Sequence, residues 1–257
     1  MRLLIVGGGR MGEALLGGLL AAGWDDLGVV EKVGDRRAEL EARFPDVAVL
    51  ADIAPCDGAV VAVKPNDVRT ACEALAGTKR VLSIAAGVPI ATLEAALGAG
   101  TAVVRAMPNT PALVGAGAAA IAGGTAAGDD DLDWAESILG AVGEVVRVPE
   151  SLLDAVTGLS GSGPAYVFLV AEALIEAGVL NGLPREVSVA LATQTLLGAA
   201  RLLAETGDSP EALRAQVTSP GGTTAAGLHV LESAGLRAAF LDAVSAATAR
   251  SRELGQS

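Results

Sequence analysis

Short apolar runs alternate with amphipathic stretches along the first 150 residues. The runs at residues 3–6, 27–30, 47–50, 59–63, 81–84, 101–106, 116–122 and 144–148 predict buried strands. Helical patterns at residues 13–22, 35–43 and 129–139 lie between them. Strands that alternate with helices are typical of an α/β fold built on a mainly parallel sheet. We therefore expect a dinucleotide-binding, Rossmann-type domain over residues 1–149.

Strand patterning stops at residue 150, and the remaining sequence predicts helices separated by Gly, Pro and Asn-Gly breaks. The expected helices cover residues 151–157, about 160–180, 184–206 and 225–236. Residues 187–203 are apolar around most of the helix circumference, which a domain of about 100 residues cannot bury alone. The sequence therefore predicts an all-helical domain over residues 150–257 that dimerises.

Composition narrows the range of functions. The formal net charge of −12 argues against nucleic-acid and anionic-membrane partners, since both require a basic surface. Two cysteines and one histidine offer neither a disulfide framework nor a metal-binding spacing. No targeting segment precedes the first strand, and the longest uncharged stretch, residues 107–128, is interrupted by Pro and Gly. We expect a cytoplasmic protein without a membrane span or a metal.

A glycine-rich loop follows the first predicted strand. Gly7, Gly9 and Gly12 have the spacing G-x-G-x-x-G between a strand and a helix, which is the context of the dinucleotide fingerprint. Gly7 would make the tight turn, Gly9 would admit the pyrophosphate, and Gly12 would allow close helix packing. A purely structural turn is the alternative. With Arg10 and Met11, which complete the loop, these glycines are the first cofactor-binding candidates.

The second predicted strand ends where a dinucleotide fold contacts the adenosine ribose. Glu31 suits a free 2′-hydroxyl, whereas Lys32, Arg36 and Arg37 could pair with a 2′-phosphate. The basic residues could equally be the solvated first turn of the next helix. The residues alone leave NADH and NADPH open.

Three further loops follow predicted strands, at the sheet edge where ligands bind in open parallel sheets. Lys64 is expected to face the cofactor, although a surface lysine is the alternative. The loop at residues 85–87 has small side chains that permit contact. Asn109, held between two prolines, is either a nicotinamide neighbour or part of a stiff loop. The cofactor candidates in these loops are Val63, Lys64, Pro65, Ala85, Ala86 and Asn109.

The segment 217–224, Val-Thr-Ser-Pro-Gly-Gly-Thr-Thr, leads directly into a predicted helix. Pro220 fixes a turn, Gly221 and Gly222 can adopt positive φ, and a threonine can cap the helix. Amides at such a helix start bind a carboxylate or phosphate. The alternative is a plain interhelical turn.

This octapeptide resembles the signature of the pyrroline-5-carboxylate reductase family, and the resemblance extends along nearly the whole chain. Similar segments are Ala-Val-Lys-Pro at 62–65, Ser-Ile-Ala-Ala-Gly at 83–87, Arg-Ala-Met-Pro-Asn-Thr-Pro at 105–111 and Gly-Leu-Ser-Gly-Ser-Gly-Pro-Ala-Tyr at 158–166. The resemblance implies NAD(P)H-dependent reduction of 1-pyrroline-5-carboxylate to L-proline, the last step of proline biosynthesis. It implies NADPH as cofactor, with NADH possible, and a homodimer assembled into a larger ring such as a decamer.

The chemistry expected at the octapeptide requires orientation rather than a nucleophile, because a cyclic iminium already accepts hydride. Thr224 is the catalytic candidate, since its hydroxyl could hydrogen-bond the ring nitrogen. The amides of Gly222, Thr223 and Thr224 could hold the carboxylate. By resemblance, Glu150 and Gln216 line the pocket; otherwise they are a linker charge and a helix-end amide. The substrate candidates are Glu150, Ser219, Gly222, Thr223 and Thr224, and Gln216 is placed with the cofactor.

Two other functions are alternatives to a reductase of this family. A β-hydroxyacid dehydrogenase-type enzyme would need a catalytic lysine in the second half of the chain, and no lysine follows Lys79. A non-catalytic NAD(P)-binding scaffold would not need the intact segment 219–224. Both features favour the reductase.

Overall fold

The computed structural model describes residues 2–255 and divides into two compact units. Of the described residues, 2–162 and 245–255 form the first unit, and 163–244 form the second. The predicted boundary at residues 149 and 150 is therefore close to, but not the same as, the first crossing between the units. The division into a cofactor-binding part, residues 1–149, and a dimerising part, residues 150–257, stays a prediction.

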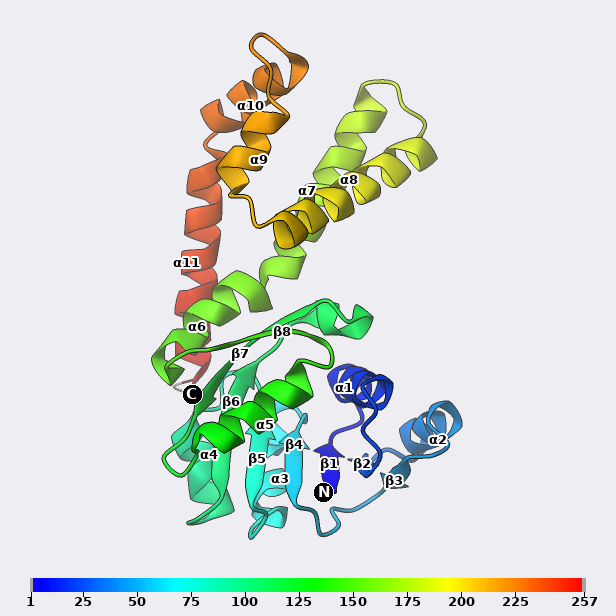
Figure 1. The fold of residues 1–257 in the computed structure, drawn as a ribbon, viewed down its shortest axis with the longest axis vertical. Helices are drawn as coiled ribbons and strands as arrows, with labels where there is room; N and C mark the ends of the chain where they lie inside the picture. The colour runs from blue at the N-terminus through cyan, green and yellow to red at the C-terminus, as the bar shows by residue number, and fades with distance from the viewer. Residues whose placement is uncertain (1, 256–257) are drawn as a thin grey trace. The chain divides into compact units, whose positions relative to one another are not determined.

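The first unit is built on one eight-stranded sheet with the order β3-β2-β1-β4-β5-β6-β7-β8 (Figure 1). All neighbouring strands are parallel except β6 and β7, which are antiparallel. Each predicted apolar run forms a strand, shifted by at most two residues. The strands are β1 (Leu3–Val6), β2 (Leu27–Val30), β3 (Ala48–Leu50), β4 (Gly58–Val61), β5 (Arg80–Ser83), β6 (Ala102–Met107), β7 (Gly117–Gly123) and β8 (Gly143–Arg147).

Helices cover both faces of this sheet, as a doubly wound α/β fold requires. One hydrophobic cluster contains residues of α1 (Arg10–Ala21), α2 (Gly34–Arg43) and α5 (Asp129–Leu139). A second cluster contains residues of α3 (Val68–Ala74), α4 (Ile90–Leu97) and α6 (Leu153–Val156). Short helical turns complete the unit: η1 (Pro65–Asp67), η2 (Thr110–Val114), η3 (Glu150–Leu152) and the π-helical η4 (Thr157–Gly161).

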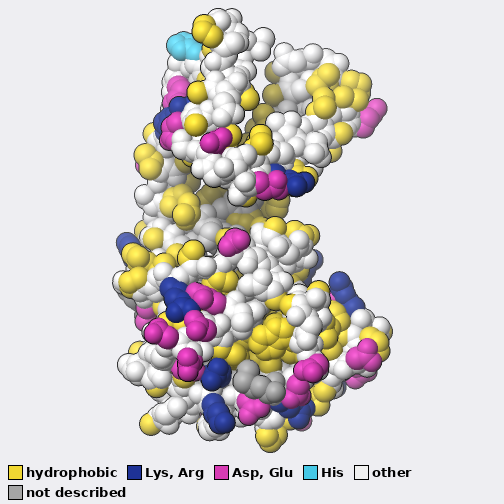
Figure 2. All heavy atoms as spheres, viewed as in Figure 1, with side chains coloured by type: hydrophobic (Ala, Val, Ile, Leu, Met, Phe, Trp, Pro, Cys, Tyr) yellow, Lys and Arg dark blue, Asp and Glu magenta, His cyan; other side chains and the backbone are white. Residues whose placement is uncertain are grey.

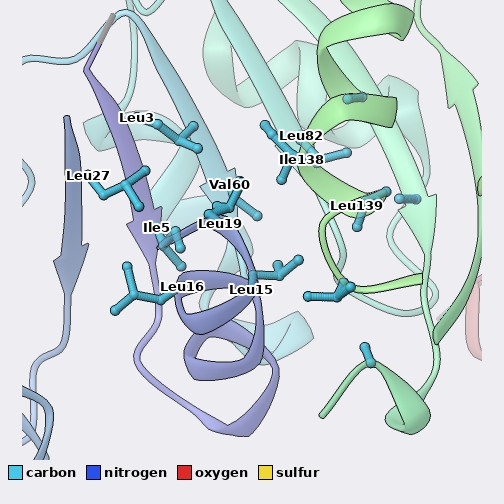
Figure 3. Packing of buried hydrophobic residues seen from close by; sticks show 14 of the residues in the cluster. Leu3, Ile5, Leu15, Leu16, Leu19, Leu27, Val60, Leu82, Ile138 and Leu139 are labelled. Carbon is cyan, nitrogen blue, oxygen red and sulfur yellow. The ribbon is translucent and has the colours of Figure 1, made fainter. Parts of the chain in front are cut away.

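The core beneath α1 shows how the first loop is supported. Leu15, Leu16 and Leu19 of α1 are fully buried against the central strands, close to Leu3 and Ile5 of β1 (Figure 3). Because these leucines recur at helical spacing, one face of α1 lies on the sheet. The helix start is thereby fixed at the carboxyl end of β1.

The second unit consists of helices, as predicted. They are α7 (Gly163–Leu180), α8 (Arg185–Thr206), α9 (Pro210–Gln216), α10 (Thr223–Ser233) and the first part of α11 (Leu236–Gly255), whose residues from 245 onward belong to the first unit. Helices α7 and α8 pack against each other, and Ser188 Oγ donates a hydrogen bond of 2.7 Å to the Ile175 carbonyl. A Cβ on Gly178 would lie 2.2 Å from that hydroxyl, so a glycine permits this close crossing.

Apolar side chains remain exposed along α7 and α8. Phe168, Leu169 and Leu191 each expose more than half of their surface, and hydrophobic side chains reach the molecular surface in Figure 2. The segments 150–180 and Arg185–Thr206 have the length and hydropathy that a membrane span needs. The expectation that the chain has no membrane span was based on residues 107–128. These residues contain η2 and β7 and are not part of either helical segment. These two helical segments therefore need a cover for their apolar surface.

Two glycines of α1 predict opposite effects on stability. A Cβ on Gly12 would lie 2.0 Å from the Gly7 carbonyl oxygen, whereas one on Gly17 would meet only the Phe44 ring, at 3.9 Å. We expect Gly12→Ala to lower the free energy of unfolding by about 1–3 kcal/mol or more. Gly17→Ala should raise it by about 0.5–1 kcal/mol through helix propensity. Chemical denaturation of both variants measures the signs; a loss in Gly17→Ala as large as in Gly12→Ala would contradict this account.

Candidate functional site

The loop after β1 has the backbone geometry that the glycine motif predicts. Gly7 has φ of +115°, and a Cβ there would lie 2.6 Å from the Ala62 carbonyl oxygen. Gly12 faces the Gly7 carbonyl, as described above. A Cβ on Gly9, by contrast, would meet no atom of residues 2–255 within 4 Å. Gly7 and Gly12 therefore close the loop, and Gly9 leaves its outer side open to a ligand.

Helix α1 presents its first amides at this open side. Its N-cap is Gly9, which has no side chain to accept a hydrogen bond from them. The first amides of a helix lack intrahelical acceptors and, with the helix dipole, favour a negatively charged group. The loop can thus bind an anion such as a pyrophosphate.

The loop lies at the point where the strand order reverses. The chain leaves β1 toward β2 and β3 and then returns to β4 on the other side of β1. In open α/β sheets the ligand crevice forms at the carboxyl ends of such strands. A groove of about 520 Å³ is found there, lined by Val6, Gly7, Gly9, Val30, Glu31, Lys32, Val33, Ala51, Asp52, Ile53, Ala62, Val63, Lys64, Asp67, Thr70, Ala71 and Ala74.

The groove brings together some of the predicted cofactor residues. Gly7, Gly9, Glu31, Lys32, Val63 and Lys64 line it. The predicted residues Arg10, Met11, Gly12, Arg36, Pro65, Ala85, Ala86 and Asn109 do not. Sequence reasoning missed Asp52 and Asp67. Asp52 follows the end of β3, so the rule that ligands bind at carboxyl ends of strands could have found it.

Glu31 is held firmly at the end of β2. Its Oε2 accepts a hydrogen bond of 3.1 Å from the Gly8 amide, and its Oε1 accepts one of 2.9 Å from the Val33 amide. Gly8 was not singled out from the sequence, yet a Cβ there would lie 2.5 Å from Leu40 Cδ1 and 3.1 Å from Glu31 Cβ. The glycine loop and the acidic residue therefore form one hydrogen-bonded unit.

The two arginines near this corner are engaged away from the groove. Arg36 donates from Nε to the Gly8 carbonyl at 2.8 Å and pairs with Glu39 at 2.7 Å and Glu13 at 2.5 Å. The hydrogen bonds that Arg36 donates to the carboxylates of Glu39 and Glu13 raise the pKa of Arg36. Arg37 Nη1 donates to the carbonyls of Glu31 and Lys32. Both guanidinium groups already hold the loop and helix α2 in place.

The side chains of Asn109 and Glu150 form hydrogen bonds between separate segments of the first unit. Asn109 accepts from the Ala118 amide at 2.8 Å and donates to the Ser160 carbonyl at 3.0 Å. The Glu150 carboxylate accepts from the Ile90 amide and from Arg105, each at 2.8 Å. These bonds join segments 9 to 60 residues apart. The predicted ligand roles of Asn109 and Glu150 stay predictions, and their polar atoms have structural partners.

The second candidate site is the turn before α10. Gly221 has φ of +70°, and the Gly222 amide donates to the Ser219 carbonyl at 3.0 Å. Pro220 followed by a glycine with positive φ is typical of a type II turn. The turn delivers the chain into α10, whose N-cap is Gly222 and whose first residues are Thr223 and Thr224.

Three expectations for this turn need correction. Gly222 is extended, with φ of −78°, so only Gly221 adopts positive φ. No threonine caps the helix, because the N-cap position falls on Gly222. The Gly222 amide is used by the turn, which leaves the amides of Thr223 and Thr224 as donors. Over residues 2–255, neither these amides nor the Thr224 hydroxyl has a hydrogen-bond partner.

The remaining candidates of the helical unit lie at its surface. Ser219 is exposed within the turn. Gln216 ends α9, where its Nε2 donates to Asp208 at 3.4 Å. This hydrogen bond does not distinguish a ligand-binding Gln216 from a surface residue.

The cysteines do not provide a nucleophile. Both are free thiols, and burial raises the pKa of Cys72 to about 11 and also raises the pKa of Cys56. A thiol with a raised pKa stays protonated and poorly nucleophilic at neutral pH. Across residues 2–255, no three His, Cys, Asp or Glu side chains gather in a way that could hold a metal ion.

The strand order, the glycine loop and the groove define a Rossmann-type dinucleotide-binding oxidoreductase. Residues 2–87 match the model of the family "NADP oxidoreductase coenzyme F420-dependent", and residues 150–254 match "Pyrroline-5-carboxylate reductase dimerisation". The chain belongs to the pyrroline-5-carboxylate reductase family.

Relatives of the whole chain bear this out. The pyrroline-5-carboxylate reductase of Methanosarcina acetivorans is 46% identical over 98% of this chain and 97% of its own length. That of Mycobacterium tuberculosis is 45% identical over 98% of this chain and 96% of its own.

Solved structures agree. A pyrroline-5-carboxylate reductase from Coxiella burnetii matches with a TM-score of 0.93 at 40% identity, covering 98% of both chains. A pyrroline carboxylate reductase from Plasmodium falciparum with NADP bound matches with a TM-score of 0.85 at 30% identity, covering 99% of this chain and 98% of that one.

The open side of Gly9 can be tested by adding one methyl group. Gly9→Ala should keep the melting temperature, because a Cβ has free space and φ is −68°. It should weaken dinucleotide binding by about tenfold or more, since the methyl group occupies the position of a closely approaching pyrophosphate. Gly128→Ala is the matched control: Gly128 is also an N-cap glycine with nothing within 4 Å, at α5. Unchanged binding in Gly9→Ala, measured by calorimetry, would remove this loop from the cofactor site.

Proposed function

We propose that this protein reduces 1-pyrroline-5-carboxylate to L-proline with NADPH or NADH, the last step of proline biosynthesis. The observation that carries the proposal is the union of two features in one chain. The first unit has a dinucleotide groove at the switch point of its sheet. The second has helix-start amides and a threonine hydroxyl without hydrogen-bond partners among residues 2–255.

The residues present fit a nicotinamide dinucleotide. Because Gly7, Gly9 and Gly12 have no side chains, the loop leaves room for a pyrophosphate at the start of α1. The groove places Glu31 and Lys64 at the carboxyl ends of β2 and β4, where the rest of an adenosine would lie. When bound, the reduced nicotinamide supplies the hydride.

The chain's own residues have to bind and orient the imine. We infer that the amides of Thr223 and Thr224 hold the substrate carboxylate, because they lie at the positive end of the α10 dipole. The Thr224 hydroxyl then hydrogen-bonds the ring nitrogen. Positioning of this kind suffices, since the protonated imine carries the positive charge that attracts hydride.

Two further features belong to this proposal. The apolar surfaces of α7 and α8 are covered by a second copy of the chain, which agrees with the dimerisation family matched over residues 150–254. Assembly of dimers into a ring such as a decamer, and a cytoplasmic location, rest on the family resemblance. A membrane is not needed to cover these helices once the dimer forms.

The proposal is tested by following oxidation of NADPH and of NADH by the purified protein with and without 1-pyrroline-5-carboxylate. We expect oxidation only when the imine is present, with proline as the product. Cofactor binding without oxidation in the presence of the imine would leave a dinucleotide-binding protein of another function.

Thr224→Ala is expected to slow reduction while leaving dinucleotide binding unchanged. Loss of one positioned hydrogen bond costs about 0.5–1.5 kcal/mol, and more when a buried partner stays unpaired. We therefore expect kcat/KM to fall by about one to two decades, because about 1.4 kcal/mol corresponds to tenfold. Thr224→Ser keeps the hydroxyl and should recover most of the activity.

A purely structural role for Thr224 has a different signature. The Ala variant would then lose thermal stability and keep its turnover per folded molecule. Melting temperature and kcat/KM, measured on the same preparation, separate the two roles. Wild-type turnover in Thr224→Ala would end the catalytic assignment.

The assembly is tested by light scattering over a dilution series. We expect no monomer at concentrations where the protein is active, because the apolar surface of α7 and α8 exceeds what the unit buries. Leu191→Glu, in an exposed position of α8, should produce monomers or aggregates, whereas Leu113→Glu in η2 should not alter the assembly. An active monomer would show that the unit needs no partner.

A further inference from the structure

The corner where β2 ends decides which adenosine ribose the groove accepts. In a dinucleotide fold an acidic residue at this position hydrogen-bonds the 2′-hydroxyl, whereas a nearby arginine accommodates a 2′-phosphate. Glu31 follows the last residue of β2 directly and lines the groove. Its two carboxylate oxygens are fixed by the amides of Gly8 and Val33. The acceptor is therefore built into the loop and does not depend on a mobile side chain.

Of the three basic residues that could favour a phosphate, Lys32 lines the groove next to Glu31, whereas the two arginines are not available. Neither Arg36 nor Arg37 lines the groove. Arg36 is held by a carbonyl and two carboxylates, and Arg37 by two carbonyls. To reach a 2′-phosphate, Arg36 would have to leave its ion pair with Glu13, which is also paired with Arg43 at 2.5 Å. A phosphate would thus compete with bonds that already tie α1 to α2.

The charge of the groove opposes a phosphate as well. Its charged lining residues are the carboxylates Glu31, Asp52 and Asp67 and the ammonium groups Lys32 and Lys64, an excess of one negative charge. A phosphate monoester carries a charge between about −1.5 and −2 at neutral pH. A carboxylate such as that of Glu31 can accept hydrogen bonds from ribose hydroxyls but has no proton to donate to a phosphate oxygen.

We infer that this chain selects NADH over NADPH and that Glu31 is the residue that determines the choice. The inference rests on the proposed function, because it concerns the same groove. It reverses the preference for NADPH that the family resemblance implied. The P. falciparum relative was solved with NADP bound, so the inference concerns the residues of this chain's ribose corner and not the family fold.

The experiment is direct titration of the full-length protein with NADH and with NADPH, without the imine, followed by nicotinamide fluorescence. We expect NADH to bind at least about tenfold more tightly, since it gains hydrogen bonds to an ionised group where NADPH meets like charge. Equal or tighter binding of NADPH overturns the inference. If neither cofactor binds, the proposed function fails with it; if NADPH is preferred and proline is formed, only the inference fails.

Variants then test Glu31 itself. Glu31→Gln keeps the shape and one acceptor oxygen but removes the charge, so the ratio of the two dissociation constants should shift toward NADPH by about tenfold. Glu41→Gln removes one charge from an exposed position of α2 that does not line the groove, and should leave the ratio unchanged. An unchanged ratio in Glu31→Gln removes Glu31 from the choice.

The basic residues have their own variants. If Lys32 or Arg36 held a 2′-phosphate, its replacement by Ala would weaken NADPH more than NADH, whereas our assignment expects the affinities for the two cofactors to change together. Should a Glu31 variant fail to fold, the wild-type ratio and the response of Arg36→Ala still decide the inference. A selective loss of NADPH in Arg36→Ala would contradict it.

Discussion

The first unit depends on two close backbone contacts at Gly7, which leave no room for a side chain. The carbonyl of Gly7 faces Gly12, and Gly7 itself lies against the carbonyl of Ala62. This approach joins β1, β4 and the start of α1 at the switch point of the sheet. The leucines of α1 stabilise the helix on the sheet, but the glycines determine how closely its positive end approaches the groove.

The same reliance on small residues shapes the helical unit, with a different result. Hardly any aromatic side chain is present to fill a core, and α7 and α8 approach closely at Gly178 and Ser188. Much of the hydrophobic surface of α7 and α8 therefore lies outside their mutual contact and stays exposed. In the proposed dimer, burying that surface against another copy would contribute to the stability of both, and folding would be coupled to assembly.

Much of the fold could be predicted because it follows from local patterns. Buried strands read as short apolar runs bounded by polar or glycine residues, and α5 was predicted with its observed bounds. Helices α3 and α4, of seven and eight residues, were not predicted, because so few turns leave little periodicity to detect. The antiparallel pairing of β6 with β7 depends on tertiary contacts that the strand pattern does not encode.

The candidate site also contains residues that could be predicted from the sequence and contacts that could not. Gly7, Gly9 and Lys64 could be placed because a strand end fixes where the next residues lie. The partners of polar side chains could not be predicted: Arg36 contacts Gly8 across 28 positions, and Glu150 contacts Ile90 across 60. Such pairs form only when separate elements pack. Even a local contact could not be predicted in the turn before α10. There the amide of Gly222 donates to the Ser219 carbonyl and is not free for a ligand.

Helix α11 gives the chain an unusual order of parts. It begins in the helical unit, and its residues from 245 onward return to the first unit, where Ser251 donates to Asp154 at 2.7 Å. In topological terms the helical unit is an insertion with two crossings, and the second crossing lies within a continuous helix. A nucleotide-binding fragment cut after residue 149 would therefore lack both the acceptor Asp154 and the helix that binds it. Swapping the helical unit between relatives would need matched junctions at both crossings.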